Sequence, residues 1–197
     1  MRPILLARHG ETSWNALGRL QGHTDIALND VGRTQARGLA ARLADAGLTA
    51  VWTSHLVRAR ETGEIVADVL GLAAPAVDPE LRERRYGVFE GLTRSECATQ
   101  HPEAWRDWLA QVGTPPGGEA RDDAAARLGR ALGRIAASEG GPVLVVSHGG
   151  VMRLWLMTVL GASVPLISNA ATYVVEHHAA SVRVRLLANG ESPTSQQ

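Results

Sequence analysis

The sequence contains no lysine, so all 20 of its Lys+Arg residues are arginines. The absence of lysine excludes a Walker-type phosphate loop, a Schiff-base enzyme and a kinase site that depends on lysine. The acidic residues number 20 as well, and a net charge of zero gives no general attraction to nucleic acid or to an anionic membrane. A bound anion must therefore meet arginine, histidine, a backbone N–H group or a metal ion.

Cysteine and long apolar runs are also scarce. Cys97 stands alone, which excludes a disulfide framework, a paired-cysteine zinc site and a CxxC redox motif. The apolar run at residues 4–7 is too short for a signal peptide, and no run reaches the roughly 18 residues of a membrane span. We expect a cytoplasmic protein with one domain over residues 1–188 and a flexible tail over residues 189–197.

Strand-like and helix-like segments alternate along the chain, which predicts an α/β fold with a mostly parallel central sheet between two helical layers. Residues 92–118 are less regular and predict a helical insertion with short helices at 93–100 and 102–111. The expected strands are 3–7, 49–53, 74–77 and 142–147, followed by an antiparallel pair at 173–178 and 182–187. The expected longer helices are 30–46 after the N-cap Asn29, 57–70, 119–139 and 151–160.

Chemically active side chains follow several of these strands. Because the carboxyl ends of parallel strands meet at one edge of a sheet, we expect the side chains that follow them to converge. These residues are Arg8, His9, Arg58, Glu83 and His148. Guanidinium groups bind phosphate oxygens with forked hydrogen bonds, a neutral imidazole can act as a nucleophile, and a carboxyl group can move the proton of a leaving oxygen. The set predicts phosphoryl transfer through a histidine, with no metal and no cofactor.

Simpler interpretations of these residues stay open at this point. His148 could only cap the helix that follows it, and Glu83 could belong to a surface ion-pair cluster with its arginine neighbours. Glu80 is an alternative to Glu83 as the acid. The five tryptophans are expected in the core or in a pocket wall, and nothing in their spacing supports a nucleic-acid partner.

Four motifs occur in an order that resembles the histidine phosphatase superfamily, in its phosphoglycerate-mutase-like branch. The matching segments extend from residue 3 to about residue 172. The motifs are Arg8-His9-Gly10-Glu11-Thr12, Arg58-Ala59-Arg60-Glu61-Thr62, Leu81-Arg82-Glu83 with Gly87 and Glu90-Gly91, and Ser147-His148-Gly149-Gly150.

This resemblance implies a phosphoglycerate-mutase-like fold and a role for each matching residue. His9 would become phosphorylated, Glu83 would donate the proton, and the phosphoryl group would be bound by Arg8, Arg58 and His148. Asn15, Gln21 and Gly22 match the segment that closes over the phosphate. Further substrate contacts are expected from Arg84, Tyr86, Arg94 and Gly149.

The sequence carries signals of both phosphatases and mutases. The short segment 92–118 and the loop Pro115-Pro116-Gly117-Gly118-Glu119 resemble phosphatases, whereas residues 83–87 and Arg94 resemble mutases. We expect a metal-independent phosphomonoesterase for a small phosphorylated metabolite that carries a carboxylate, and a homodimer is common in such folds. The alternatives are a cofactor-dependent phosphoglycerate mutase and, more remotely, an inactive phosphate-binding or scaffold protein. A metallohydrolase lacks a ligand motif such as HExxH.

Overall fold

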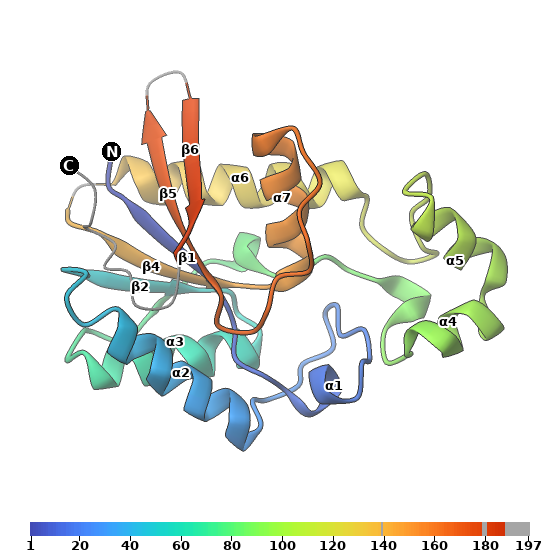
Figure 1. The fold of residues 1–197 in the computed structure, drawn as a ribbon, viewed down its shortest axis with the longest axis horizontal. Helices are drawn as coiled ribbons and strands as arrows, with labels where there is room; N and C mark the ends of the chain where they lie inside the picture. The colour runs from blue at the N-terminus through green and yellow to red at the C-terminus, as the bar shows by residue number, and fades with distance from the viewer. Residues whose placement is uncertain (139, 179–180, 188–197) are drawn as a thin grey trace.

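The computed structural model describes residues 1–138, 140–178 and 181–187. A six-stranded sheet with the order β3-β2-β4-β1-β5-β6 forms its centre (Figure 1). The strands are β1 Ile4–Arg8, β2 Ala50–Thr53, β3 Ala76–Val77, β4 Val143–Ser147, β5 Thr172–His178 and β6 Ser181–Leu186. β1 to β4 are parallel, while β5 is antiparallel to both β1 and β6. The predicted mostly parallel sheet is confirmed.

Helices cover both faces of the sheet, as predicted. α2 and α3 pack below it in Figure 1 and α6 and α7 pack above it, whereas α4 and α5 project away from the sheet. The α-helices are α1 Ser13–Ala16, α2 Asp30–Arg42, α3 Val57–Val69, α4 Arg94–Gln100, α5 Pro102–Leu109, α6 Arg121–Ala137 and α7 Gly149–Leu160, and the 3-10 turns are η1 Pro79–Leu81 and η2 Gly87–Phe89.

The two central strands alternate between two hydrophobic cores. In β1, Ile4 and Leu6 pack toward α6 and α7, while Leu5 and Ala7 pack toward α2 and α3. β4 repeats this alternation, and its residues are all buried. A strand between two helical layers must be apolar on both faces, which explains the continuous apolar runs. The register pairs Arg8 with Ser147, so His9 and His148 leave the sheet side by side.

Several predicted helix boundaries are wrong. α2 begins after Asn29, whose side chain accepts a bond from the N–H of Gly32 at 2.8 Å, but it ends at Arg42 and not at residue 46. The N–H of Leu43 bonds the carbonyls of both Leu39 and Ala40, which tightens the last turn and ends the helix. α7 begins two residues earlier than predicted, and β3 keeps only two residues.

α6 is also shorter than predicted. It starts at Arg121 because the backbone of Glu119 pairs with the strand-like segment before η2, where its N–H bonds the carbonyl of Arg85 at 2.9 Å. The helix ends at Ala137. Residue 139, at the predicted helix end, and the predicted tail at 189–197 lie outside the described residues.

Candidate active site

A cavity of about 590 Å³ lies where the parallel strands end, between the sheet and α5. Among the residues predicted for the site, all but Gly22 and His148 line it. Those that do are Arg8, His9, Asn15, Gln21, Arg58, Glu83, Arg84, Tyr86, Arg94 and Gly149. The sheet edge thus brings together side chains that are far apart in the sequence, as expected for parallel strands.

His9 is buried at the inner end of this cavity and its ring is oriented by the backbone. Nδ1 lies 2.6 Å from the carbonyl oxygen of Gly10. Because that oxygen can only accept, Nδ1 carries the proton and Nε2 keeps its lone pair. Burial, with the charges of Arg8 and Arg58, holds the pKa of His9 well below its usual value. The ring is therefore neutral and can act as a nucleophile at neutral pH.

His148 lies beside His9, with 5.1 Å between the two ring centroids. It is fully buried, and burial followed by the charge of Arg58 lowers its pKa well below the usual value. Its Nε2 lies 2.7 Å from the hydroxyl of Ser54, which accepts a bond from the N–H of Leu56 at 3.3 Å. The His148 side chain makes no capping bond to α7, although the residue is the N-cap. The side chain of His148 therefore does not cap α7.

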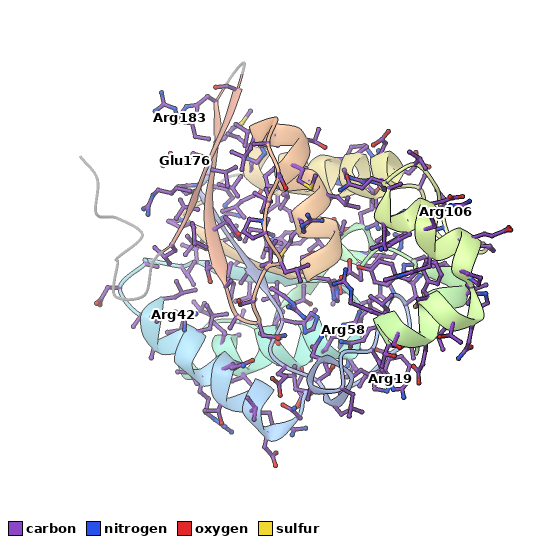
Figure 2. The ribbon with its side chains drawn as sticks, turned by 45° about the vertical axis from the view of Figure 1, so that its right-hand side comes forward. Arg19, Arg42, Arg58, Arg106, Glu176 and Arg183 are labelled. Atoms are coloured by element: carbon purple, nitrogen blue, oxygen red, sulfur yellow. The ribbon has the colours of Figure 1, made fainter. Side chains whose placement is uncertain are left out.

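Two guanidinium groups flank the histidines. Arg58 on α3 is fully buried and donates to the carbonyls of Thr24 and Gly22 at 2.9 and 2.8 Å. Figure 2 shows Arg58 in the interior, in contrast to Arg106 on the outside of α5. Arg8 donates to the carbonyl of Ile167 at 2.6 Å. The Nε atoms of both Arg8 and Arg58 lack a partner among the described residues, so each guanidinium keeps bonding capacity for an anion.

Glu83 reaches the cavity from the segment that follows η1. Its Oε1 accepts bonds from the N–H groups of Arg84 and Val151, both at 2.7 Å, and its Oε2 accepts one from Gly150 at 2.9 Å. The first turn of α7 thus fixes the carboxylate, which matches the preference of helix N-termini for negative charge. Oε2 retains a lone pair for a proton or a substrate oxygen.

Glu80, the alternative acid, lies elsewhere. Its carboxylate forms ion pairs with Arg130 at 3.2 Å and Arg134 at 2.6 Å, and it does not line the cavity. Glu83 is 6 % exposed and has backbone partners, so it does not belong to a surface ion-pair cluster with its arginine neighbours. Position and bonding both favour Glu83 as the acid and base.

The segment after β1 contributes polar groups to the cavity. Asn15 lines it, and its side-chain oxygen accepts the N–H of Thr12 at 3.2 Å, which leaves its NH₂ group to face a ligand. Gln21 also lines the cavity, and its Oε1 is buried without a partner in the described ranges. Gly22 does not line it and instead holds Arg58 through its carbonyl.

The outer part of the cavity differs from this inner part. We call the lining residues Arg8, His9 and Arg58, together with His148 packed beside His9, the floor. We call Arg84, Arg94, Trp105, Trp108 and Arg121 the wall. The guanidinium carbons of Arg84 and Arg94 lie 4.4 and 5.8 Å from the ring centres of Trp108 and Trp105. Tyr86 lies between floor and wall. Burial and the nearby carboxylate of Glu83 raise its pKa, so its hydroxyl stays protonated and can donate a bond.

Sequence reasoning missed several residues that support these groups. Asn169 donates to the carbonyl of His9 at 3.1 Å, Ser54 contacts His148, and Arg121 and Arg153 line the cavity. Their partners are distant in the chain, so no spacing pattern marks them. Ser147 also supports the site, because its hydroxyl donates to the carbonyl of Leu81 at 2.8 Å. It is the one supporting residue that a motif marks, since it begins the Ser147-His148-Gly149-Gly150 motif.

Within the described ranges, no three His, Cys, Asp or Glu side chains form a group that could hold a metal ion. None of the helices in those ranges is both long and apolar enough to cross a membrane.

The fold and the floor define an α/β protein with two buried histidines and two arginines at the carboxyl edge of its sheet. Residues 4–190 match the histidine phosphatase superfamily (branch 1). The chain is 39% identical over 178 residues to the metal-independent phosphoserine phosphatase of Arabidopsis thaliana, covering 87% of this chain and 75% of that protein. It is 42% identical over 155 residues to phosphoglycerate mutase-like protein 4 of Arabidopsis thaliana, covering 76% and 67%.

Among solved structures, a mycobacterial glucosyl-3-phosphoglycerate phosphatase in complex with VO3 is similar, with a TM-score of 0.82 and 32% identity. That match covers 94% of this chain and 97% of the other. The chain therefore belongs to the histidine phosphatase superfamily. This membership supports phosphatase or mutase activity on phosphate esters.

Proposed function

We propose that the protein is a metal-independent phosphomonoesterase that acts through a phosphohistidine at His9. The observation that carries this proposal is the orientation of His9, whose Nδ1–H is bonded to the carbonyl of Gly10 while Nε2 keeps its lone pair. A buried neutral imidazole between Arg8 and Arg58 has both the nucleophile and the charges that a phosphoryl group requires. The phosphoserine phosphatase relative, which is named metal-independent, supports the same chemistry.

The proposed cycle has two steps. Nε2 of His9 attacks phosphorus, the bond from phosphorus to the alcohol oxygen breaks, and Glu83 supplies the proton that the leaving oxygen needs. Water then attacks the phosphohistidine while Glu83 takes a proton from it, and phosphate leaves as the imidazole is regenerated. Arg8, Arg58 and His148 hold the phosphoryl oxygens through both steps.

The test is to trap the intermediate. We expect a phosphomonoester to label the protein with a phosphoryl group that is labile in acid and stable in base, and a chelator to leave turnover unchanged. His9→Ala should abolish both the label and turnover, whereas His55→Ala, which alters an exposed histidine outside the cavity, should retain both. No label with any ester, together with chelator-sensitive turnover, would overturn the proposal.

We further propose that the substrate carries a second anionic group, such as a carboxylate. Arg94 and Arg121 line the wall, and neither has a carboxylate partner within the described part of the chain. Arg84 and Tyr86 add a buried cation and a hydrogen-bond donor nearby. O-Phosphoserine and O-phosphoethanolamine differ only by a carboxylate, so equal kcat/KM values for the two would contradict this part of the proposal.

A mutase is the second candidate, favoured by the Glu83–Gly87 sequence and by the phosphoglycerate mutase-like relative. A mutase must retain the phosphoryl group, whereas a phosphatase releases it to water. An assay of 3-phosphoglycerate with added bisphosphoglycerate separates the two, because a phosphatase releases free phosphate and a mutase forms an isomer. We expect free phosphate.

A further inference from the structure

The segment that carries Glu83 is held in place by side chains of other elements. Four consecutive carbonyls, those of residues 80–83, each accept a bond from a side chain. Arg127 donates to the carbonyl of Glu80 at 2.6 Å and to that of Arg82 at 2.9 Å. Ser147 donates to the carbonyl of Leu81 at 2.8 Å. The fourth, that of Glu83, lies 2.9 Å from Nε2 of His23 and 3.4 Å from Nη2 of Arg127. Arg127 thus takes part in three of the four anchors.

Arg127 is itself fixed by Glu119. The two side chains are only 5% and 16% exposed and meet through two bonds, Nε to Oε1 at 2.9 Å and Nη2 to Oε2 at 2.7 Å. Glu119 also holds the two residues that follow Glu83. Its N–H donates to the carbonyl of Arg85, and its carbonyl accepts a bond from Nε of Arg84 at 2.8 Å. Burial alone would raise the pKa of Glu119, but the bonds and charge of Arg127, together with the N–H of Arg85 and the charge of Arg82, lower it.

We propose that the Arg127–Glu119 pair is a positioning unit for the acid and base work of Glu83, an inference that rests on the proposed function. Neither residue lines the cavity, so the pair acts through the backbone on both sides of Glu83. This backbone comprises the end of η1 and the segment that follows it, which lacks the ladder of a strand, so its carbonyls depend on side-chain donors. A displacement near 1 Å at a catalytic group can cost about a hundredfold in rate.

A purely structural role predicts a different outcome. A buried ion pair is weak evidence for stability. If the pair only supported the fold, its loss would lower the amount of folded protein and would slow the hydrolysis of every substrate alike. A loss of positioning at Glu83 instead slows esters whose leaving oxygen needs a proton and spares those whose leaving group departs as a stable anion. Leaving-group dependence therefore separates the two roles.

The experiment measures kcat/KM of Glu119→Gln and Arg127→Lys on p-nitrophenyl phosphate and on O-phosphoserine. We expect a loss of about 10- to 100-fold on O-phosphoserine and of less than about threefold on p-nitrophenyl phosphate. Arg130→Met is the matched control, because Arg130 lies on the same helix and contacts Glu80 only through an exposed ion pair. It should leave both values unchanged.

Glu83→Gln provides the reference, and it should show the same selectivity more strongly. If Glu83→Gln is not selective, or if the wild-type protein hydrolyses no phosphomonoester, the proposed function falls and this inference falls with it. If Glu83→Gln is selective while Glu119→Gln loses activity equally on both esters or on neither, only the inference is overturned. Thermal unfolding of each variant establishes that it is folded, and Glu119→Gln alone decides the question if Arg127→Lys does not fold.

Discussion

The floor of the cavity and Arg94 in its wall are held in opposite ways. Floor side chains such as Arg58, His9 and His148 are 0 to 2% exposed and are fixed by bonds to backbone or to Ser54. In the wall, Arg94 is exposed at the start of α4, and its guanidinium lies over the face of Trp105. The difference supports the proposal that the chemical step uses buried, preorganised groups and that substrate choice uses groups that can adjust.

The largest expected effect tests the floor. Arg58→Lys replaces two directed guanidinium bonds with a point charge, and we expect kcat/KM to fall by about 10²- to 10³-fold on every phosphate ester. Arg106→Lys is the control, because Arg106 is 73% exposed on the outside of α5 and should not affect turnover. Comparable activity in the two variants would show that the floor does not depend on the guanidinium of Arg58.

The second effect concerns stability, since the floor buries two neutral histidines and the wall buries none. The pKa values of His9 and His148 are well below the usual 6.5 in the folded protein, so only the unfolded chain takes up these protons as the pH falls. Below about pH 6.5, each histidine should therefore lower the free energy of unfolding by about 1.4 kcal/mol for each unit by which the pH falls. The two histidines together should change the unfolding equilibrium constant by about a hundredfold per pH unit.

Urea unfolding between about pH 7.5 and pH 5 measures this slope. His23 and His177 also have lowered pKa values, so the comparison needs variants. His148→Gln should reduce the slope by about 1.4 kcal/mol per pH unit, and His55→Gln, at an exposed position, should not. Identical slopes in the two variants would contradict the burial of a neutral His148.

Ser54→Ala tests whether the floor depends on its supporting bonds. The hydroxyl of Ser54 fixes the ring of His148, and loss of one such bond costs about 1 to 1.5 kcal/mol, or about tenfold. We expect kcat and the affinity for inorganic phosphate to fall together, because both depend on the position of His148. An unchanged phosphate affinity would show that His148 is held without Ser54.

The smallest effect belongs to the wall. Arg94→Gln should reduce kcat/KM for O-phosphoserine by about threefold, as expected for an exposed charge, and should leave O-phosphoethanolamine unaffected. The ratio of the two substrates is the quantity to measure. A loss on both substrates as large as that of Arg58→Lys would place Arg94 with the floor.

The same contrast explains how much could be predicted. Arg8, His9 and His148 were predictable because parallel strands end at one edge and each residue follows an apolar run. Arg127 and Ser54 act on residues about 45 and 94 positions away, and that pairing depends on how α6 and β2 pack, which no local pattern contains. Glu119 was placed inside a helix because its neighbours favour one, and its tertiary bonds to Arg85 and Arg127 prevailed.

Gly150 joins the catalytic carboxylate to the helix that follows β4. Its N–H bonds Glu83, and a side chain there would collide with the hydroxyl of Tyr86 and with the Glu83 carboxylate itself. Even a single methyl group would have to displace the Tyr86 hydroxyl and the Glu83 carboxylate. The structure therefore favours glycine at this position, and under the proposed function we expect Gly150→Ala to reduce turnover. The absence of a Cβ atom at Gly150 leaves the space that the Tyr86 hydroxyl and the Glu83 carboxylate occupy.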